Sequence, residues 1–346
     1  MIKHSWYLKD IGKKNKTGLK VFSTFSCGGG STMGYKLAGA EVLGCLEIDE
    51  KMMEIYKANH NPKYSFKMAI QDFNKMTNEE LPEELFDLDI LDGSPPCSTF
   101  SMAGKREQKW GEENFFREGQ EVQVLDDLFF HFIDTVDKLR PKVVIAENVK
   151  GLILGNAKGY VKEIFKGLQD IGYNVQLYLL NAAKMEVPQR RERTFFIARR
   201  KDLDLPRIDL NFNKKTISFL DATKDLNIEK RKPLRDNLVQ YWRKLSPGEP
   251  IDKVHPKGHF FSHYKVNPTL PAKTIIANGP THMHWDNPVY ISDKELIRIQ
   301  TFPEDFNFLG NNVQYVLGMS VPPYMIMNLV KEIYRQLFCS IPKKVY

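Results

Sequence analysis

Cys97 is the residue of this chain with the clearest signs of a nucleophile. It follows Gly-Ser-Pro-Pro at 93–96, in a polar loop that comes directly after an apolar run. The two prolines fix the backbone before the cysteine and hold its thiol in one direction. A following helical turn would favour the reactive thiolate. A lone cysteine is more often a small core residue, but its place in this loop favours the nucleophile.

Glu147 and two arginines could handle the charge that such a nucleophile creates. Glu147 ends the apolar run 143–146, where a partly desolvated carboxylate could exchange a proton with a bound base. Gln189, Arg191 and Arg193 alternate along an extended segment, so we expect them to share one face and one site. The alternative for Glu147 is a carboxylate that pairs with a helix cap. The alternative for the segment with the two arginines is an exposed basic edge strand.

A Gly-rich turn and three downstream residues predict a nucleoside site. The turn, Phe-Ser-Cys-Gly-Gly-Gly at 25–30, follows an apolar run and opens a helix, and Glu47 ends the next run. This arrangement suits ribose hydroxyls, whereas the spacing of a diphosphate-binding loop is missing. Asp72, followed by Phe73, could bind an adenine amino group and cover its ring. The alternative for the turn is a tight strand–helix connection without a ligand, and the alternative for Asp72 is a surface cap.

A sheet must position these residues. Strands are expected at 19–25, 41–49, 86–96, 141–149, 174–182 and 193–200, and helices at 126–139 and 160–173. Such alternation predicts an α/β fold with a mostly parallel sheet covered by helices on both faces. Ligands bind beyond the carboxyl ends of the strands in these sheets.

The composition changes near residue 201. Residues 201–285 contain 15 Lys+Arg against 9 Asp+Glu, which is most of the formal +7 of the chain. This basic composition suits an anionic partner, although a solvated, loop-rich domain shares it. Helical patterning then returns. We therefore expect a catalytic and cofactor-binding domain over 1–200, a smaller irregular domain over 201–285, and a C-terminal segment, 286–346, that returns to the catalytic domain.

Composition also excludes several classes of protein. Hydrophobic residues make up 42% of the 346 residues, enough for a sizeable core. The sequence contains no long apolar run that would predict a membrane span, and its N-terminus does not resemble a secretory signal. The four cysteines are scattered, so we expect neither a disulfide scaffold nor a zinc site, and a cytosolic setting follows.

The motifs, taken in order, resemble those of the DNA cytosine-5 methyltransferases. Phe-Ser-x-Gly-Gly, Glu-Ile-Asp, Pro-Pro-Cys, Glu-Asn-Val and Gln-x-Arg-x-Arg occur in the linear order of that family. Residues 295–303 look like its Arg-Leu-Gln-x-Phe-Pro helix, and 318–322 like its Gly-Asn-Ser/Ala-Val-Pro motif. The likeness covers 19–200 and about 265–335.

Four positions depart from the family pattern. Ser23 stands where an Asp usually opens the first motif, and 27–30 read Cys-Gly-Gly-Gly in place of Gly-Cys-Gly-Gly. Ser98 replaces a common Gln, and Met319 replaces the Asn of the last motif. The change at Met319 could alter how the last motif orders the methionine end of the cofactor.

The resemblance implies methyl transfer from S-adenosylmethionine to carbon 5 of a cytosine in DNA, with S-adenosylhomocysteine as the product and no metal. Cys97 would add to carbon 6 of the ring. Glu147 would hold the exocyclic amine and nitrogen 3, and Asn148 would orient the Glu147 loop. Arg193 would contact the base carbonyl oxygen, and Arg191 would support the catalytic loop.

The resemblance also implies a cofactor site. Phe25 would cover the adenine edge, Glu47 would bind the ribose hydroxyls, and Ile48 would flank the adenine. The other implied cofactor residues are Ser26, Gly28, Gly29, Gly30, Asp72, Phe73, Pro96, Leu128, Ser320 and Val321.

By the same resemblance, 201–285 is a target-recognition domain that reads a short duplex sequence of roughly 4–6 base pairs. The cytosine must leave the stack, at a cost of about a few kcal/mol. The implied DNA contacts are Gln189, Thr274 and Arg298. The enzyme would be a monomer in the cytosol of a bacterium, or of a host if phage- or virus-encoded. A separate restriction endonuclease would be its counterpart.

Three alternatives stay open. The same scaffold could methylate cytosine in transfer RNA, or bind DNA without catalysis. The joint presence of Cys97, Glu147 and Arg193 argues against the second of these. A nucleotide-dependent oxidoreductase is suggested by the expected fold alone, and the missing G-x-G-x-x-G argues against it.

Overall fold

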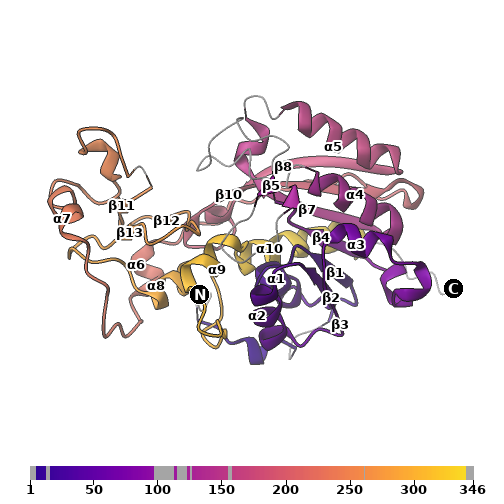
Figure 1. Cartoon of the computed structure of the whole chain (residues 1–346), viewed down its shortest axis with the longest axis horizontal. Coiled ribbons are helices and arrows are strands. Elements are labelled where there is room, and N and C mark those ends of the chain that lie inside the picture. Colours follow the sequence, from indigo (N-terminus) through magenta and orange to yellow (C-terminus); the bar gives the residue numbers. More distant parts are fainter. Residues whose placement is uncertain are drawn as a thin grey trace. The chain divides into compact units, whose positions relative to one another are not determined.

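The computed structural model describes residues 5–12, 16–96, 113–114, 123–124, 127–154, 158–260 and 262–339. The chain forms two compact units (Figure 1). We call them the sheet unit, which comprises 12–180, 192–211 and 327–346, and the second unit, which comprises 1–11, 181–191 and 212–326. No helix in the described part of the chain is both long and apolar enough to cross a membrane.

A seven-stranded sheet in the order β3-β2-β1-β4-β7-β10-β8 organises the sheet unit. Its strands are β1 (Lys20–Thr24), β2 (Glu41–Glu47), β3 (Tyr64–Lys67), β4 (Ile90–Gly93), β7 (Val143–Val149), β8 (Tyr173–Asn181) and β10 (Glu192–Arg200). Strands β3, β2, β1, β4 and β7 run parallel to one another, and β10 is antiparallel to β7. The predicted α/β fold with a mostly parallel sheet is therefore confirmed.

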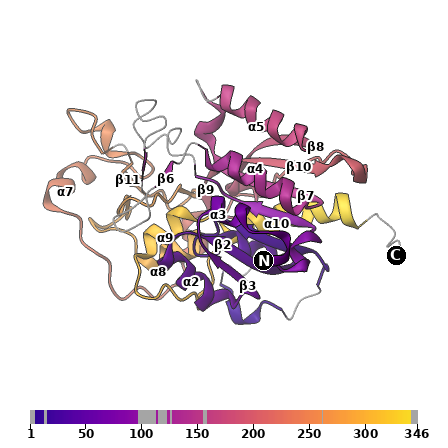
Figure 2. The ribbon, with the colours of Figure 1, turned by 45° about the vertical axis from the view of Figure 1, so that its right-hand side comes forward.

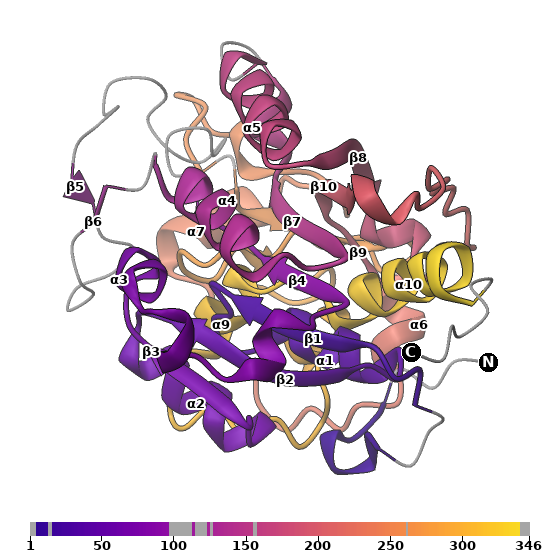
Figure 3. The same ribbon diagram turned by 90° about the vertical axis from the view of Figure 1, so that its right-hand side faces the viewer.

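Helices cover both faces of this sheet (Figures 2 and 3). Helices α1 (Gly30–Leu37) and α2 (Glu50–His60) pack on one face, and α3 (Ile70–Lys75), α4 (Leu128–Leu139) and α5 (Lys158–Asp170) on the other. Side chains alternate along each strand, so Phe22, Leu91 and Val144 join the core beneath α3–α5. Cys45 points the other way and packs on Met53 of α2.

The second unit is built from short elements. Its helices are α6 (Phe219–Thr223), α7 (Asp236–Trp242), α8 (Asp293–Ile299) and α9 (Val313–Met319). Its paired strands are β9 (Gln189–Arg190) with β12 (Ala272–Lys273), and β11 (Tyr264–Lys265) with β13 (His282–Met283). A small core around Leu238, Ile251 and Met283 holds one part of it together.

Helix α10 (Pro323–Ile333) begins in the second unit and ends in the sheet unit. Between Pro96 and Asp127 the structure describes only the short pair β5 (Glu113–Asn114) and β6 (Gln123–Val124).

The units divide the chain differently from the expected domains. The expected boundaries lay at 200/201 and 285/286, whereas the second unit also takes 181–191 and the helices α8 and α9. The hydrogen bonds of Gln189 and Arg191, described below, explain this difference. They join 181–191 to segments near 275, 300 and 318.

Candidate active site and cofactor site

The Gly-rich turn after β1 has a left-handed backbone. Phe25, Cys27 and Gly29 have φ values of 51°, 47° and 88°. A Cβ on Gly29 would lie 2.1 Å from His60 Nε2, so no larger residue fits there without displacing the histidine. The turn therefore passes close over the end of α2 before α1 begins at Gly30.

Glu47 lies at the end of β2, beside this turn. Its side chain is buried, its Oε2 accepts the N–H of Cys27 at 2.7 Å, and its Oε1 accepts the N–H of Asp49 at 2.9 Å. Burial raises the pKa of Glu47 to about 7, although both hydrogen bonds oppose the shift. Each carboxylate oxygen can accept a further hydrogen bond, so the group fits a ligand that presents hydroxyl donors, such as a ribose.

Three other predicted cofactor residues differ in their surroundings. Phe73 is fully buried, stacks on Phe22 at 5.8 Å between ring centroids, and belongs to the core beneath α3–α5. Leu128 is buried in the same core. Asp72 is exposed on α3 and forms an ion pair with Lys75 at 2.9 Å. We do not propose Phe73 or Leu128 as cofactor contacts, because either contact would require the core to open.

Glu147 and Arg193 form a largely buried ion pair. Strands β7 and β10 are antiparallel, and the register pairs Glu147 with Phe195, two residues beyond Arg193. Arg193 Nε lies 2.8 Å from Glu147 Oε1, and the two side chains are 14% and 11% exposed. Burial lowers the pKa of Arg193, while the adjacent carboxylate opposes that shift. The pair fixes the orientation of the carboxyl group, as a group that acts on a bound base requires.

Asn148 joins β7 to the loop that leads to the predicted nucleophile. Its Nδ2 donates to the carbonyl oxygen of Pro95 at 3.0 Å, and its Oδ1 accepts the N–H of Val149 at 2.8 Å. Cys97 and Ser98 lie outside the described residues. The role of Cys97 as nucleophile therefore stays a prediction, but the loop two residues before it is tied to the strand that carries Glu147.

The two arginines of the Gln-x-Arg-x-Arg motif belong to different units. Arg191 is buried in the second unit, where it donates to the carbonyl oxygens of Ile275 at 3.0 Å and Gly318 at 2.9 Å. Gln189 is also buried there and donates to Gln300 Oε1 at 2.6 Å. The expectation that all three motif side chains share one site is corrected, because a break between β9 and β10 sends Arg191 into the second unit.

The predicted DNA contact Arg298 is a structural residue of the second unit. Its guanidinium is 4% exposed and forms ion pairs with Asp225 and Glu304. Since two carboxylates take up its charge, we do not carry Arg298 forward as a DNA contact. Gln189 is likewise buried, whereas Thr274 is partly exposed and donates to the carbonyl oxygen of Arg190 at 2.9 Å.

The C-terminal motif is fixed within the second unit. Ser320 Oγ donates to the carbonyl oxygen of Val316 at 2.7 Å, and Val321 is buried. A Cβ on Gly318 would lie 2.4 Å from the backbone nitrogen of Ala277, so this position requires glycine. Met319, the departure from the family pattern, is 37% exposed.

Asp92, which belongs to none of the predicted motifs, is a carboxylate buried in the middle of the sheet. It lies on β4, is 2% exposed, and accepts hydrogen bonds from the hydroxyls of Ser23 and Tyr35. An acidic residue inside an apolar strand segment was the available signal.

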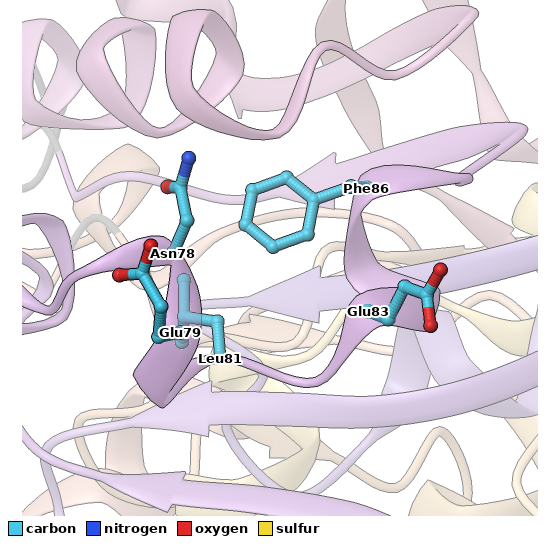
Figure 4. Close-up of a pocket in the computed structure, with 5 residues that line it drawn as sticks. All are labelled: Asn78, Glu79, Leu81, Glu83 and Phe86. Atoms are coloured by element: carbon cyan, nitrogen blue, oxygen red, sulfur yellow. The ribbon is translucent and has the colours of Figure 1, made fainter.

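A surface hollow of about 370 Å³ contains none of the predicted residues (Figure 4). Its lining residues are Asn78, Glu79, Leu81, Glu83 and Phe86. No group of three or more His, Cys, Asp or Glu side chains in the described ranges could hold a metal ion.

Known proteins are similar to this chain in sequence or in fold. A Type II methyltransferase of Fusobacterium nucleatum, M.FnuDI, is 28% identical over 91% of this chain and 94% of its own length. M.NgoFVII of Neisseria gonorrhoeae is 29% identical over 91% of this chain and 86% of its own length. The structure of a DNMT2 mutant from Spodoptera frugiperda matches with a TM-score of 0.64 at 18% identity, over 92% of this chain and 100% of that one.

The family comparison covers most of the chain and agrees with the motif order. The family model described as C-5 cytosine-specific DNA methylase matches residues 19–335. The chain belongs to the C-5 cytosine-specific DNA methylases, and it is a DNA cytosine-5 methyltransferase.

Proposed function

We propose that this enzyme transfers a methyl group from S-adenosylmethionine to carbon 5 of a flipped-out cytosine within a short duplex DNA sequence. The observation that carries this proposal is the buried Glu147–Arg193 pair, whose strand is tied through Asn148 to the loop preceding Cys97. The relatives named as Type II methyltransferases support a role as the modification enzyme of a restriction–modification system.

The turn at 25–30 and Glu47 would hold the cofactor. Bound S-adenosylmethionine would supply an electrophilic methyl group on a sulfonium. Glu47 would accept the ribose hydroxyls while it keeps the N–H groups of Cys27 and Asp49, which hold its carboxylate in place. Phe25, Ile48, Pro96, Ser320 and Val321 are the further proposed cofactor contacts.

The side chains of this enzyme would make the cytosine ring nucleophilic. The Cys97 thiolate would add to carbon 6, so that the ring electrons become available at carbon 5. Glu147, oriented by Arg193, would bind the exocyclic amine and share a proton with nitrogen 3, which neutralises the developing charge. Loss of the carbon 5 proton after methylation would expel the cysteine and restore the ring.

Duplex DNA is the proposed substrate. Residues 201–285 carry an excess of positive charge, with 15 Lys+Arg against 9 Asp+Glu. This charge supports phosphate contacts that would offset the cost of extruding the base. Thr274 is the remaining proposed groove contact. We further propose that the enzyme acts as a monomer in the cytosol.

A transfer assay tests the proposal. Purified enzyme with methyl-tritiated S-adenosylmethionine should label duplex DNA and leave transfer RNA unlabelled. Label confined to RNA would favour the transfer-RNA alternative, and no label in either would contradict methyl transfer altogether. Bisulfite sequencing of the host DNA would then read the modified cytosine and its sequence context.

A further inference from the structure

His60, the last residue of α2, packs against the Gly-rich turn of the proposed cofactor site. The residue is 6% exposed, and a Cβ on Gly29 would lie 2.1 Å from its Nε2 and 2.4 Å from its Cδ2. These distances are much shorter than a van der Waals contact, so the absent side chain of Gly29 leaves room that the imidazole ring occupies. The ring is therefore in direct contact with one side of the turn.

Contacts with α1 and within α2 hold His60 in place. Its carbonyl oxygen accepts a hydrogen bond from Lys36 Nζ at 3.0 Å. Its ring makes an edge contact with the ring of Tyr56 at 4.7 Å between centroids, and the Tyr56 hydroxyl lies 2.8 Å from Thr32 Oγ1. The two residues from α1 are four positions apart, as are the two from α2, so each pair shares one face of its helix. The position of the ring is thus fixed from both helices.

The imidazole of His60 is uncharged. Burial lowers its pKa to about 3, and the charge of Lys36 adds to the shift, although the backbone of Gly28 opposes it. The ring therefore stays neutral at the pH at which an enzyme of this family works. A neutral ring can support the turn without repelling the positively charged sulfonium of the cofactor.

The path of the turn also determines a hydrogen bond of Glu47. Cys27, two residues before Gly29, donates its N–H to Glu47 Oε2 at 2.7 Å. Cys27 and Gly29 both have positive φ values, 47° and 88°, so this N–H points at the carboxylate only while the turn keeps its left-handed path. A displaced turn would release the carboxylate that is proposed to bind the ribose.

We propose that His60 is a positioning residue of the cofactor site, whose ring holds the turn at 25–30 in the conformation that binds S-adenosylmethionine. The inference rests on the proposed function, because it assumes that this turn and Glu47 hold the cofactor. His60 acts through the backbone of the turn and touches neither the cofactor nor the cytosine. Loss of the ring should therefore weaken cofactor binding and leave the chemical step intact.

The test compares cofactor binding and turnover in His60→Ala. The dissociation constant for S-adenosylmethionine, measured by isothermal titration calorimetry, should rise roughly tenfold. The kcat at saturating cofactor and duplex DNA should stay within about twofold of the wild type, because the groups that act on the base are unchanged. An unchanged dissociation constant would overturn the proposal, and so would a loss confined to kcat.

Tyr56→Phe is the matched control. It keeps the ring that contacts His60 and removes only the hydroxyl that is hydrogen-bonded to Thr32. The free energy of unfolding should fall, since a buried hydroxyl loses its partner, while the dissociation constant for the cofactor should not change. If Tyr56→Phe weakens binding as much as His60→Ala, loosening of α1 and α2 explains both effects and the proposal fails.

Gly29→Ala tests the same contact from the side of the turn. The new Cβ would collide with the ring of His60 and would also require a residue other than glycine at a φ of 88°, so cofactor binding should weaken. In the double variant with His60→Ala the collision is absent, and the combined loss of affinity should be smaller than the product of the two single losses. Losses that multiply would contradict the proposal. Should His60→Ala not fold, unchanged binding by Gly29→Ala would contradict it as well.

The behaviour of the wild type separates this inference from the proposed function. Wild-type enzyme that does not bind S-adenosylmethionine would reject the proposed function, and this inference with it. Wild-type enzyme that binds the cofactor and methylates duplex DNA, together with wild-type affinity in His60→Ala, would reject only the role of His60.

Discussion

Glu47, at the end of β2, and Glu147, in the last half of β7, are both buried carboxylates of one sheet, but their partners differ. Glu47 accepts hydrogen bonds from two backbone N–H groups, whereas Glu147 forms an ion pair with Arg193. Backbone donors do not carry a full positive charge, so burial still raises the pKa of Glu47 to about 7. The difference indicates that Glu47 is suited to hold neutral hydroxyls, and Glu147 to present one fixed orientation to a reacting base.

Glu147→Gln should separate the two carboxylates most clearly. The substitution removes the shared proton and the ion pair with Arg193, so kcat should fall roughly 10²–10³-fold. The dissociation constant for S-adenosylmethionine should change by less than about twofold. This is well below a tenfold change, which corresponds to about 1.4 kcal/mol. Single-turnover methylation and equilibrium cofactor binding measure the two effects. Equal losses in both would show that the carboxylates do not have separate tasks.

Arg191→Met tests whether Arg191 has a structural role in the second unit, in contrast to Arg193, which pairs with Glu147. The variant would leave the carbonyl oxygens of Ile275 and Gly318 without this donor, so the free energy of unfolding should fall by about 2–4 kcal/mol. Urea denaturation measures this loss. An unchanged midpoint would mean that Arg191 does not hold the second unit together.

Glu47→Ala should weaken cofactor binding by about tenfold, or about 1.4 kcal/mol. Its kcat at saturating cofactor should stay close to that of the wild type, because Glu47 is not expected to contact the base. Isothermal titration calorimetry gives the dissociation constant, and an unchanged value would remove Glu47 from the ribose site.

The pH dependence of cofactor binding is a second test of the assignment of Glu47 to the ribose site. The pKa of Glu47 is raised to about 7, so its carboxylate is mostly protonated at pH 6 and mostly ionised at pH 8. Ionised Glu47 is the better acceptor for ribose hydroxyls, and affinity should therefore rise about tenfold from pH 6 to pH 8. Glu47→Gln should lose this dependence. Wild-type affinity that is constant, or that falls with pH, would contradict the assignment.

The sequence predicted the sheet because its central strands are nearly continuous apolar runs, and it predicted Glu147 and Glu47 because each ends such a run. Apolar side chains were less informative. Phe73 and Leu128 could equally face a ligand or a core, and both lie in the core.

Long-range partners account for the other differences. Arg191 and Arg193 alternate as in one strand, but β9 ends at Arg190 and β10 begins at Glu192, so they belong to different units. Asp225 and Glu304 neutralise Arg298, but local spacing in the sequence does not identify them as its partners.

The most direct test of the account is covalent capture by Cys97. A duplex carrying 5-fluorocytosine at the target position cannot lose a proton from carbon 5, so the wild-type enzyme with S-adenosylmethionine should remain bonded to it. This adduct would be visible as a shifted band on a denaturing gel. Cys97→Ser should form no adduct and no product, while it binds the cofactor as tightly as the wild type. Absence of the adduct from active wild-type enzyme, or its formation by Cys97→Ser, would contradict the proposed mechanism.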